Sequence, residues 1–367
     1  MKILQLTASL GGGGAERIAV SLCNRFAANK DDEIVLVSIL DDSVPENVLY
    51  LNELSSQVRL INLHCKSGLE IKAIWRVFKM ISGERPNIVH CHFSVILLLL
   101  PVFLSNNIHF LHTIHTLAER QDANEGIIKK ILTHYLFKNN KVRPITISGT
   151  CHISYHKTYR VQNDICITNG SEPLRTTEKL GLVKKEIDAL KKNSDTTVFI
   201  HVGRNHPVKN HDRLFKTFFS LEAERFNFIL IVLGNNYDSW EAKLKDCKSI
   251  FLLGPKNNVG DYMAQAEYFV LSSDFEGLPM TLLEAMSMGV VPICTPAGGV
   301  VDVIEDGITG YLTKTFDDEE FYLKVKQALY EKGKISSEVI KKHFEKYFSM
   351  ETCAKNYYET YRSLINK

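Results

Sequence analysis

The sequence predicts an α/β protein with two domains, each built around a parallel sheet that is covered by helices. Three observations support this prediction. Short apolar runs alternate with amphipathic helical patterns along most of the chain, as they do in consecutive βαβ units. The chain has 367 residues, which is long for a single hydrophobic core. Several apolar runs end in glycine-rich segments, at the sheet edge where open α/β sheets bind ligands.

The composition is that of an ordinary globular protein, with 45% hydrophobic and 23% charged residues. Lysine and arginine number 44 against 42 aspartates and glutamates, so the net charge of +2 gives no reason to expect nucleic-acid binding. The eight cysteines show no CxxC spacing and are expected to be reduced, as in a cytoplasmic protein. The longest apolar run, 95–104, is about half the length of a membrane span and contains Pro101. We therefore expect no transmembrane helix.

The chain opens with an apolar run at 3–6, which we interpret as a first buried strand rather than a secretion signal. Gln5 interrupts this run, and the glycines 11–14 follow it directly. A helical pattern then continues through Phe26. A strand, a glycine loop and a helix start together form a cradle for an anion, although a tight turn without a ligand remains an alternative. The loop is not the dinucleotide fingerprint GxGxxG, because Glu16 stands where the third glycine would be.

Further strands and helices follow in alternation. We expect strands at 34–40, 58–63, 87–90, 144–148 and 164–167, and helices at 71–81 and 126–138. Both helices are basic and amphipathic, so each can either cover the sheet or lie on a membrane surface, and covering the sheet is favoured for 71–81. The first helix has Ile71, Ile74, Trp75 and Phe78 on one face beside Lys72, Arg76 and Lys79, and the second carries Lys129, Lys130, His134 and Lys138.

Two pairs of histidines close two successive strands of this half. His90 and His92 end the first of these strands, and His112 and His115 end the second. Such a group can suggest a metal cluster, but no carboxylate or thiolate stands nearby at ligand spacing. We therefore expect no metal. A turn-rich segment, 168–173, then marks a domain boundary near residue 170.

The second half begins a new sheet with a strand at 198–202. Arg204 and Lys209 lie on the loop that leaves it, where two cations can clamp a diphosphate or can simply be solvated. Two further strands, 228–233 and 251–253, end at glycines. Helices are expected near the end of the chain at 317–330, 336–347 and 350–364.

The stretch 268–312 holds the densest set of motifs. A buried strand at 268–271 leads through a turn to a helix at 280–288, and Gly289 stops that helix before the next strand, 290–294. Glu276 lies at the turn and Glu284 lies within the helix, with seven residues between them. The free amides of a helix start suit a phosphate, and a carboxylate beside them can accept sugar hydroxyls. Alternatively, Glu276 favours the helix dipole and Glu284 is solvated.

These motifs resemble the donor-site signature of the family-four retaining glycosyltransferases of GT-B fold. The resemblance rests on Glu276-x7-Glu284 with EGLP and LLEAM, on Gly298-Gly299, and on DGITGYL at 306–312, and it extends over nearly the whole chain. It implies two Rossmann-like βαβ domains that face each other across a deep cleft. Residues 1–170 would bind the acceptor, residues 171–347 would bind the donor, and residues 348–367 would form a helix that crosses back to the first domain.

The resemblance also implies the roles of individual residues. His115 matches the family's histidine beside the donor sugar best, and His112 is the alternative. The segment GR-x4-K matches the family's diphosphate clamp, whereas Asn235 stands where many relatives have a second glycine after Gly234. The implied catalytic residues are His115, Glu276, Arg204 and Lys209, and the implied donor-binding residues are Gly13, Gly14, Gly203, Gly254, Gly277, Leu278, Pro279, Met280 and Glu284.

The implied reaction moves a hexose or N-acetylhexosamine from a nucleoside diphosphate sugar to a hydroxyl of a glycan or lipid-linked acceptor, with retention of configuration. UDP is the favoured nucleotide and GDP the second, and cell-surface polysaccharide synthesis is the expected setting. No Asp-x-Asp motif occurs, so no bridging metal and no cofactor beyond the nucleotide sugar are expected. A cytoplasmic enzyme with peripheral contact to an anionic membrane is expected. Alternatives are an epimerase or phosphorylase of the same fold, a non-catalytic nucleotide-sugar-binding subunit and, more distantly, an NAD-dependent oxidoreductase.

Overall fold

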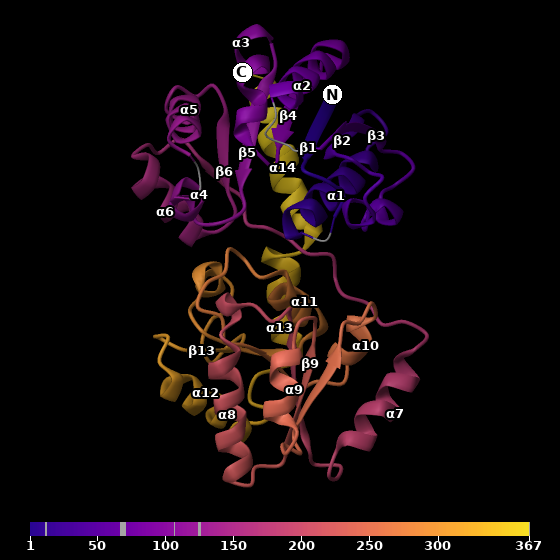
Figure 1. The fold of residues 1–367 in the computed structure, drawn as a ribbon, viewed down its shortest axis with the longest axis vertical. Coiled ribbons are helices and arrows are strands. Elements are labelled where there is room, and N and C mark those ends of the chain that lie inside the picture. Colours follow the sequence, from indigo (N-terminus) through magenta and orange to yellow (C-terminus); the bar gives the residue numbers. More distant parts are fainter. Residues whose placement is uncertain (12, 67–70, 106, 124–125, 367) are drawn as a thin grey trace. The chain divides into compact units, whose positions relative to one another are not determined.

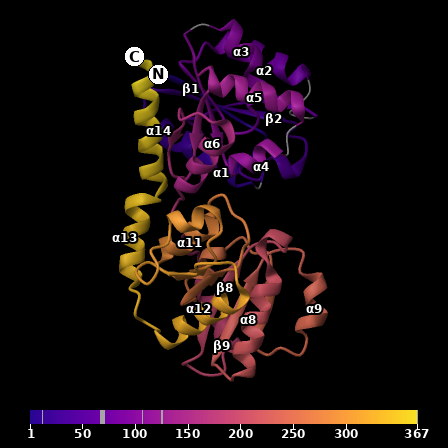
Figure 2. The ribbon, with the colours of Figure 1, turned by 90° about the vertical axis from the view of Figure 1, so that its left-hand side faces the viewer.

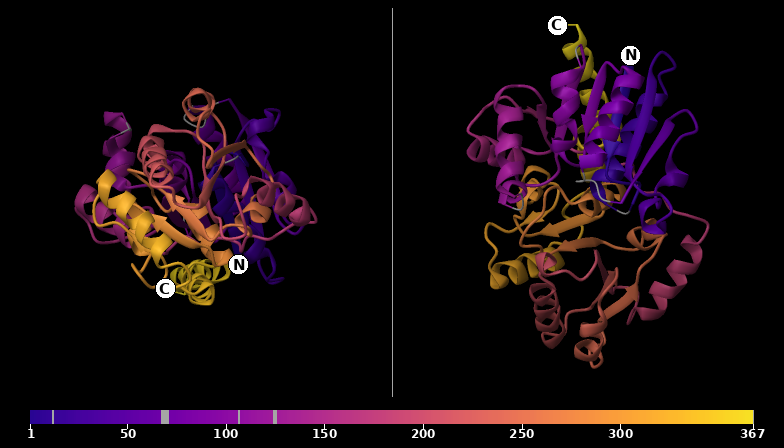
Figure 3. Two further views of the ribbon diagram at one scale, coloured as in Figure 1. Left: turned by 90° about the horizontal axis from the view of Figure 1, so that it is seen from below. Right: turned by 45° about the horizontal axis from the view of Figure 1, so that its top comes forward.

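A computed structural model describes residues 1–366 apart from 12, 67–70, 106 and 124–125 (Figure 1). The chain divides into two compact units. The first unit contains residues 1–170 together with 350–367, and the second contains residues 171–349. Each unit has one parallel sheet between helices (Figures 2 and 3).

The sheet of the first unit has seven parallel strands in the order β3-β2-β1-β4-β5-β6-β7. From β1 the chain builds the sheet outward to β3 and then returns to the other side of β1 with β4. Ligands of such sheets bind beyond the carboxyl ends of the strands at this change of direction. The strands are β1 (Lys2–Thr7), β2 (Glu33–Leu40), β3 (Arg59–Cys65), β4 (Ile88–Cys91), β5 (His109–Ile114), β6 (Arg143–Thr146) and β7 (Ile165–Cys166).

Helices connect these strands and shield the sheet from solvent. They are α1 (Gly14–Ala27), α2 (Ile71–Glu84), α3 (Leu99–Leu104), α4 (Ala118–Ala123), α5 (Ile127–Lys138), α6 (Gly149–Tyr159) and α14 (Met350–Ile365), with 3₁₀ turns η1 (Pro45–Asn47), η2 (Leu51–Glu53) and η3 (Val95–Leu98). Within the described residues, no helix has the length and apolar character that crossing a bilayer requires. The apolar run 95–104 forms η3 and α3, which pack into the core of this unit.

The last helix, α14, packs on the first unit although it follows the second unit in sequence (Figures 1 and 2). Tyr357 and Tyr361, one turn apart on α14, are completely buried. Tyr361 packs its ring edge-on against Phe26 of α1, with centroids 5.6 Å apart. Tyr358, on the neighbouring face of α14, donates a hydrogen bond to Asp32 at 2.6 Å. Burial of large side chains stabilises by about 1.5–3 kcal/mol each, so these tyrosines attach α14 firmly to the first unit.

The sheet of the second unit has six parallel strands in the order β10-β9-β8-β11-β12-β13, so its change of direction lies between β8 and β11. The strands are β8 (Thr197–Val202), β9 (Phe228–Leu233), β10 (Ile250–Gly254), β11 (Tyr268–Leu271), β12 (Val291–Cys294) and β13 (Tyr311–Leu312). The helices are α7 (Leu180–Leu190), α8 (His211–Ala223), α9 (Asp238–Leu244), α10 (Val259–Met263), α11 (Met280–Met288), α12 (Asp318–Tyr330) and α13 (Ser337–Tyr347), with η4 (Pro207–Lys209) and η5 (Gly298–Asp302). Helices α8 and α12 lie side by side, as Figures 2 and 3 show.

The expected strands and helices are present, with ends that differ by at most three residues. One expectation about packing was wrong in part. In α2 the buried face is formed by Ala73, Val77 and Ile81. Of the expected apolar face, Ile74 packs against the core, whereas Ile71 and Trp75 are exposed. The helix is therefore rotated about its axis relative to the orientation that the largest side chains suggested. Smaller side chains, Ala73 and Val77 among them, make the close contact with the sheet.

Candidate functional site

The loops after β8 and β11 meet at the change of direction of the second sheet. Lys209 Nζ donates a hydrogen bond to Glu276 Oε1 at 2.7 Å, and Ser273 Oγ donates to the same oxygen at 2.6 Å. The side chains of Lys209 and Glu276 are only 20% and 13% exposed. The structure therefore brings two of the sequence-predicted residues into one partly buried ion pair, and it adds Ser273, which the sequence analysis missed.

Backbone contacts fix the two loops against each other. Ser272 Oγ donates to the carbonyls of Lys209 and Asn210, at 2.9 and 3.1 Å. The amide of Asp274 donates to the carbonyl of Val208 at 2.9 Å. These bonds fix the main chains of both loops against each other. The loops therefore hold Lys209 and Glu276 close together independently of the ion pair between their side chains.

The Gly298-Gly299 turn packs directly against the loop of Glu276. Gly298 has φ +55°, and a Cβ atom there would lie 1.8 Å from the carbonyl oxygen of Glu276. The amide of Gly299 donates to the carbonyl of Gly277 at 2.8 Å. Only glycine fits this left-handed position at such close approach, which gives a physical reason for Gly298.

Helix α11 begins at Met280, directly after the loop of Glu276. No side chain caps its N-terminus, because the N-cap residue is Pro279. Gly289, with φ +75°, ends the helix as expected. Glu284 lies in the second turn and is 6% exposed, so the interpretation of Glu284 as a solvated residue was wrong. Burial of a carboxylate is costly unless it is paired, and Glu284 interacts with other groups of the protein.

Arg204 differs from Lys209 in its surroundings. Its side chain is exposed on the loop after β8, and among the described residues it forms no hydrogen bond or ion pair. The backbone beneath it is fixed, because Gly203 donates its amide to the carbonyl of Leu233 at 2.9 Å. Gly234 has φ +149°, and a Cβ atom there would lie 1.8 Å from the carbonyl oxygen of Gly203. Gly254, the last residue of β10, accepts a hydrogen bond from the amide of Gly234 at 3.0 Å.

Two buried histidines and a tyrosine, which the sequence did not indicate as site residues, support this loop. Tyr237 Oη donates to the carbonyl of Gly203 at 2.9 Å and lies 2.7 Å from His211 Nε2, which is 3.2 Å from His201 Nε2. His201 Nδ1 donates to the carbonyl of Val270 at 2.9 Å, so its Nε2 accepts, and His211 Nε2–H is the donor between the rings. Burial lowers the pKa of His201 to about 3 and that of His211 to about 4, so both are neutral at pH 7.

In the first unit, the glycine loop after β1 leads into α1 as expected. Gly13 is the N-cap residue of α1, and the exposed Gly14 begins the helix; Gly12 lies outside the described residues. The side chain of Glu16 folds back onto this loop, so that a Cβ atom on Gly13 would lie 2.0 Å from Glu16 Oε2. Burial raises the pKa of the Glu16 carboxyl. An anion that binds at this helix start would therefore meet the Glu16 side chain first.

The structure separates the two histidines that the sequence left as alternatives. His115 directly follows β5 and is half-buried, whereas His112 lies inside β5 and is completely buried. Among the described residues, neither ring nitrogen of His112 has a hydrogen-bond partner. Burial lowers the pKa of His115 to about 4 and that of His112 to about 3, so both rings are neutral at pH 7. Of the two, His115 is the one that can reach a ligand.

A buried hydrogen-bond network fixes the orientation of His115. Its Nε2 lies 3.0 Å from His92 Nδ1, His92 Nε2 lies 2.7 Å from Gln5 Oε1, and Gln5 Nε2 donates to Tyr361 Oη of α14 at 2.9 Å. Because the amide of Gln5 donates to Tyr361, its oxygen accepts from His92 Nε2–H, and His92 Nδ1 then accepts from His115 Nε2–H. His115 Nδ1 is left with its lone pair.

The remaining histidine of the four, His90, also bonds to protein groups. Its Nδ1 lies 2.5 Å from Tyr361 Oη, and its Nε2 lies 2.7 Å from Thr113 Oγ1. The nitrogens that a metal would need at His90 and His92 are therefore engaged in the network that joins the sheet to α14.

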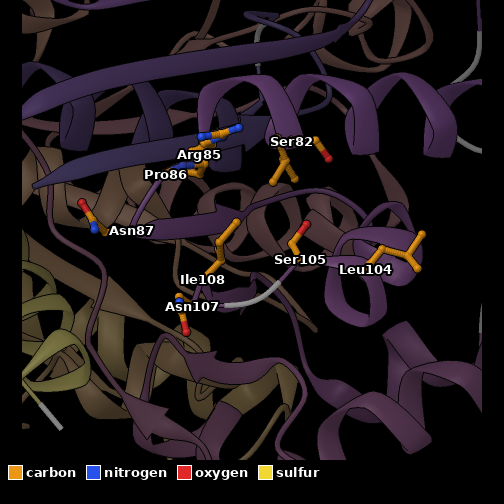
Figure 4. A pocket seen from close by; sticks show the side chains of 9 residues that line it. Ser82, Arg85, Pro86, Asn87, Leu104, Ser105, Asn107 and Ile108 are labelled. Carbon is orange, nitrogen blue, oxygen red and sulfur yellow. The ribbon is translucent and has the colours of Figure 1, made fainter.

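A pocket of about 420 Å³ in the first unit lies elsewhere (Figure 4). Asn87 and Ile108, which line it, directly precede β4 and β5, so the pocket lies at the amino ends of these strands. The glycine loop and His115 lie at the carboxyl ends. This pocket is therefore separate from the predicted site.

Comparison with known proteins decides the family. The family described as Glycosyltransferase Family 4 matches residues 12–168, and the family described as Glycosyl transferases group 1 matches residues 183–346. The chain is a family-four glycosyltransferase. An alpha-1,3-galactosyltransferase of Escherichia coli, named as acting with UDP-Gal on alpha-D-GlcNAc-diphosphoundecaprenol, is 24% identical over 315 residues, which are 78% of this chain and 75% of that protein. An uncharacterized glycosyltransferase of Methanocaldococcus jannaschii is 26% identical over 289 residues, 68% of each chain.

Solved structures place this glycosyltransferase in the GT-B fold. HepE from Anabaena, solved in complex with UDP and glucose, superposes with a TM-score of 0.77 at 15% identity and covers 99% of this chain and 100% of its own. Sucrose-phosphate synthase from Thermosynechococcus elongatus gives a TM-score of 0.80 at 15% identity, covering 100% and 99%. The expected fold and family are thus confirmed, and the enzyme belongs to a family that uses nucleotide sugars.

Proposed function

We propose that this glycosyltransferase moves a hexose or N-acetylhexosamine from a nucleoside diphosphate sugar to a hydroxyl of a glycan or lipid-linked acceptor, with UDP as the favoured nucleotide and GDP as the second. The observation that carries the proposal is the Lys209–Glu276–Ser273 cluster at the start of α11. The names of the E. coli galactosyltransferase and of the UDP-bound HepE structure support the choice of UDP and of a lipid-linked acceptor. Cell-surface polysaccharide synthesis is the setting that we propose for this reaction.

The donor's diphosphate would be bound by Arg204 and Lys209. As the bond from C1 to the diphosphate breaks, negative charge grows on the leaving phosphate, and preorganised donors aimed at that charge lower the barrier most. Lys209 is already held at the site, and the exposed Arg204 is able to close onto a phosphate in bidentate fashion. Gly277, Leu278 and Met280 would add backbone amides, whereas Pro279 has no N–H and would shape the loop.

The two glutamates would bind different parts of the donor. Glu276, at the loop, would accept hydroxyls of the sugar that is transferred, and Glu284, buried in α11, would accept the ribose hydroxyls. Gly203 and Gly254, at the ends of β8 and β10, would allow the nucleotide to approach the backbone. In this proposal residues 171–347 form the donor domain and use no metal.

Residues 1–170 would form the acceptor domain, with α14 of the segment 348–367 packed on it. His115 would act in catalysis through Nδ1, which has no hydrogen-bond partner among the described residues and whose lone pair the network from Gln5 keeps available. Gly13 and Gly14 would offer amides to the donor's phosphate once the side chain of Glu16 moves aside.

The surface of the first unit also fits peripheral contact with an anionic membrane. Ile127, Ile128 and Ile131 are 78%, 77% and 63% exposed on α5, which also carries Lys129, Lys130 and Lys138. Exposed apolar side chains beside basic ones suit the boundary between lipid headgroups and acyl chains. Contact through α5 would bring the acceptor domain to a lipid-linked acceptor.

A thermal-shift series with UDP, GDP and their sugar conjugates tests the proposal. A ligand at 100 times its dissociation constant stabilises by about 2.7 kcal/mol, so the cognate nucleotide should raise the melting temperature clearly. No shift with any nucleotide would contradict the proposal. Incubation with the cognate donor alone separates the alternatives, because an epimerase would release product without an acceptor and a transferase requires one.

A further inference from the structure

Helix α6 and the start of β7 bring together three potential metal ligands that the transfer reaction does not use. His152 and His156 lie one turn apart on α6, and Asp164 directly precedes β7. His152 Nδ1 lies 2.8 Å from Asp164 Oδ2, and His156 Nε2 lies 2.8 Å from Asp164 Oδ1. The three ligand atoms all lie within 4.8 Å of one another.

The carboxylate of this group is held in place before any ligand binds. The side chain of Asp164 is 0% exposed, and Thr146 Oγ1 donates to its Oδ2 at 2.7 Å. The preceding residue, Asn163, accepts hydrogen bonds from Tyr155 Oη at 2.7 Å and from Arg143 at 3.0 Å. The bonds to Asn163 fix the chain beside Asp164, and the bond from Thr146 gives the carboxylate an outer partner of the kind that metal ligands in proteins usually have.

The chemistry of the group suits a cation. The side chain of Asp164 is 0% exposed, and among the described residues the ionisable side chains that contact its carboxylate are His152 and His156. Imidazole nitrogens and a carboxylate oxygen are ligands that divalent transition metals accept.

We propose that His152, His156 and Asp164 form a binding site for a divalent transition-metal cation of the zinc class, with two imidazole nitrogens and one carboxylate oxygen as ligands. This donor set suits zinc, and also cobalt and nickel as probes. Tetrahedral zinc places its ligand atoms about 3.3 Å apart, so each imidazole has to move outward by roughly half an ångström. The rings have room to do so, because His152 and His156 are 38% and 26% exposed on the solvent side.

The bound ion would cross-link α6 to the edge of the first sheet, where β7 is only two residues long. Its fourth position would be open to water. Nothing in this site depends on the proposed transfer reaction, since none of the three residues is assigned to donor or acceptor binding. The i, i+4 spacing of the two histidines is visible in the sequence, but Asp164 joins them only through the fold.

Metal titration of tag-free, metal-free protein tests the proposal. Calorimetry with Zn²⁺ is expected to give one ion per chain, and Co²⁺ is expected to give the visible absorption of a tetrahedral site. His152→Gln should weaken Zn²⁺ binding by more than 100-fold, and Thr146→Val, which removes an outer partner, should weaken it by about 10- to 100-fold. His152 is partly exposed, so its variant should still fold, and a cooperative thermal melt checks this.

His64→Gln is the matched control, because His64 belongs to a second, more exposed group with Asp41 and Asp42. Retention of Zn²⁺ binding in His64→Gln together with its loss in His152→Gln supports the proposal. The proposal is overturned if the wild-type protein binds no Zn²⁺ and shows no cobalt spectrum. It is equally overturned if His152→Gln binds as tightly as wild type, or if the His64 variant is the one that loses the ion.

Discussion

The ion pair between Lys209 and Glu276 allows a quantitative test of the donor site before any substrate is known. Replacing Lys209 by methionine keeps most of the side-chain volume but leaves the Glu276 carboxylate, 13% exposed, without its cation. Breaking a fully buried pair costs about 3–5 kcal/mol, and breaking a surface pair costs about 0–1 kcal/mol. Because Ser273 still donates to the carboxylate, we expect an intermediate loss of about 1–3 kcal/mol for Lys209→Met.

Adding Glu276→Gln to Lys209→Met should restore most of the lost stability, because the double variant has no uncompensated charge. Trp75 and Trp240 are the two tryptophans of the chain, and Trp240 lies in the second unit, so urea unfolding followed by fluorescence in a Trp75→Phe background reports on that unit. Lys216→Met, on the exposed surface of α8, is the matched control and should change stability by less than about 0.5 kcal/mol. A Lys209→Met variant as stable as this control would show that the pair is not formed, and the site built on it would be wrong.

Three further outcomes are expected. Arg204→Ala should lower turnover by about 10²- to 10³-fold, the usual cost of removing one preorganised donor to a growing anion, and a loss of less than threefold would place the clamp elsewhere. Between pH 6.5 and about 4 the unfolded chain binds protons that the buried His211 does not, so stability should fall as the pH falls, with a slope of up to about 1.4 kcal/mol per pH unit. His211→Gln should make that slope shallower. An unchanged slope would show that the pKa of His211 is not lowered in the folded protein. Binding to anionic vesicles should weaken with added salt and with Ile131→Ser in α5, and flotation that is absent at low salt would exclude contact through this helix.

The fold was predictable because each strand of the sheets is a short apolar run that can be recognised in the sequence. Runs such as 228–233 are apolar on both faces, which only a doubly covered parallel sheet tolerates, and glycines punctuate their ends. The Glu276 loop was also predictable, because its turn residues and the helix that follows agree with each other. The sequence alone supplied the family's motif, and the structure supplied the ion pair that joins two of its members.

Other parts of the site depend on contacts between residues far apart in the sequence. The burial of Glu284 could not be predicted, because in the sequence it looks like any glutamate within a helix. The hydrogen bond from Tyr237 to Gly203 and the network that orients His115 through Gln5 also join residues that are far apart in the sequence, so they could not be predicted from it. The contact of the Glu16 side chain with Gly13 is between residues close in the sequence, yet it could not be predicted either. Sequence patterns do not say whether this side chain or the expected anion occupies the helix start.

The direction in which the donor lies along α11 is the central claim, and paired glutamate variants test it most directly. The measurement is calorimetric titration of Glu276→Gln and Glu284→Gln with the free nucleoside diphosphate, together with single-turnover rates; glutamine is used because Glu284 is buried and the amide keeps its volume. Glu284→Gln should weaken nucleotide binding itself, because the ribose is the same in donor and product, whereas Glu276→Gln should leave nucleotide affinity nearly unchanged and lower the rate of transfer. Loss of nucleotide affinity in Glu276→Gln with affinity retained in Glu284→Gln would contradict the account and would mean that the donor binds in the opposite direction.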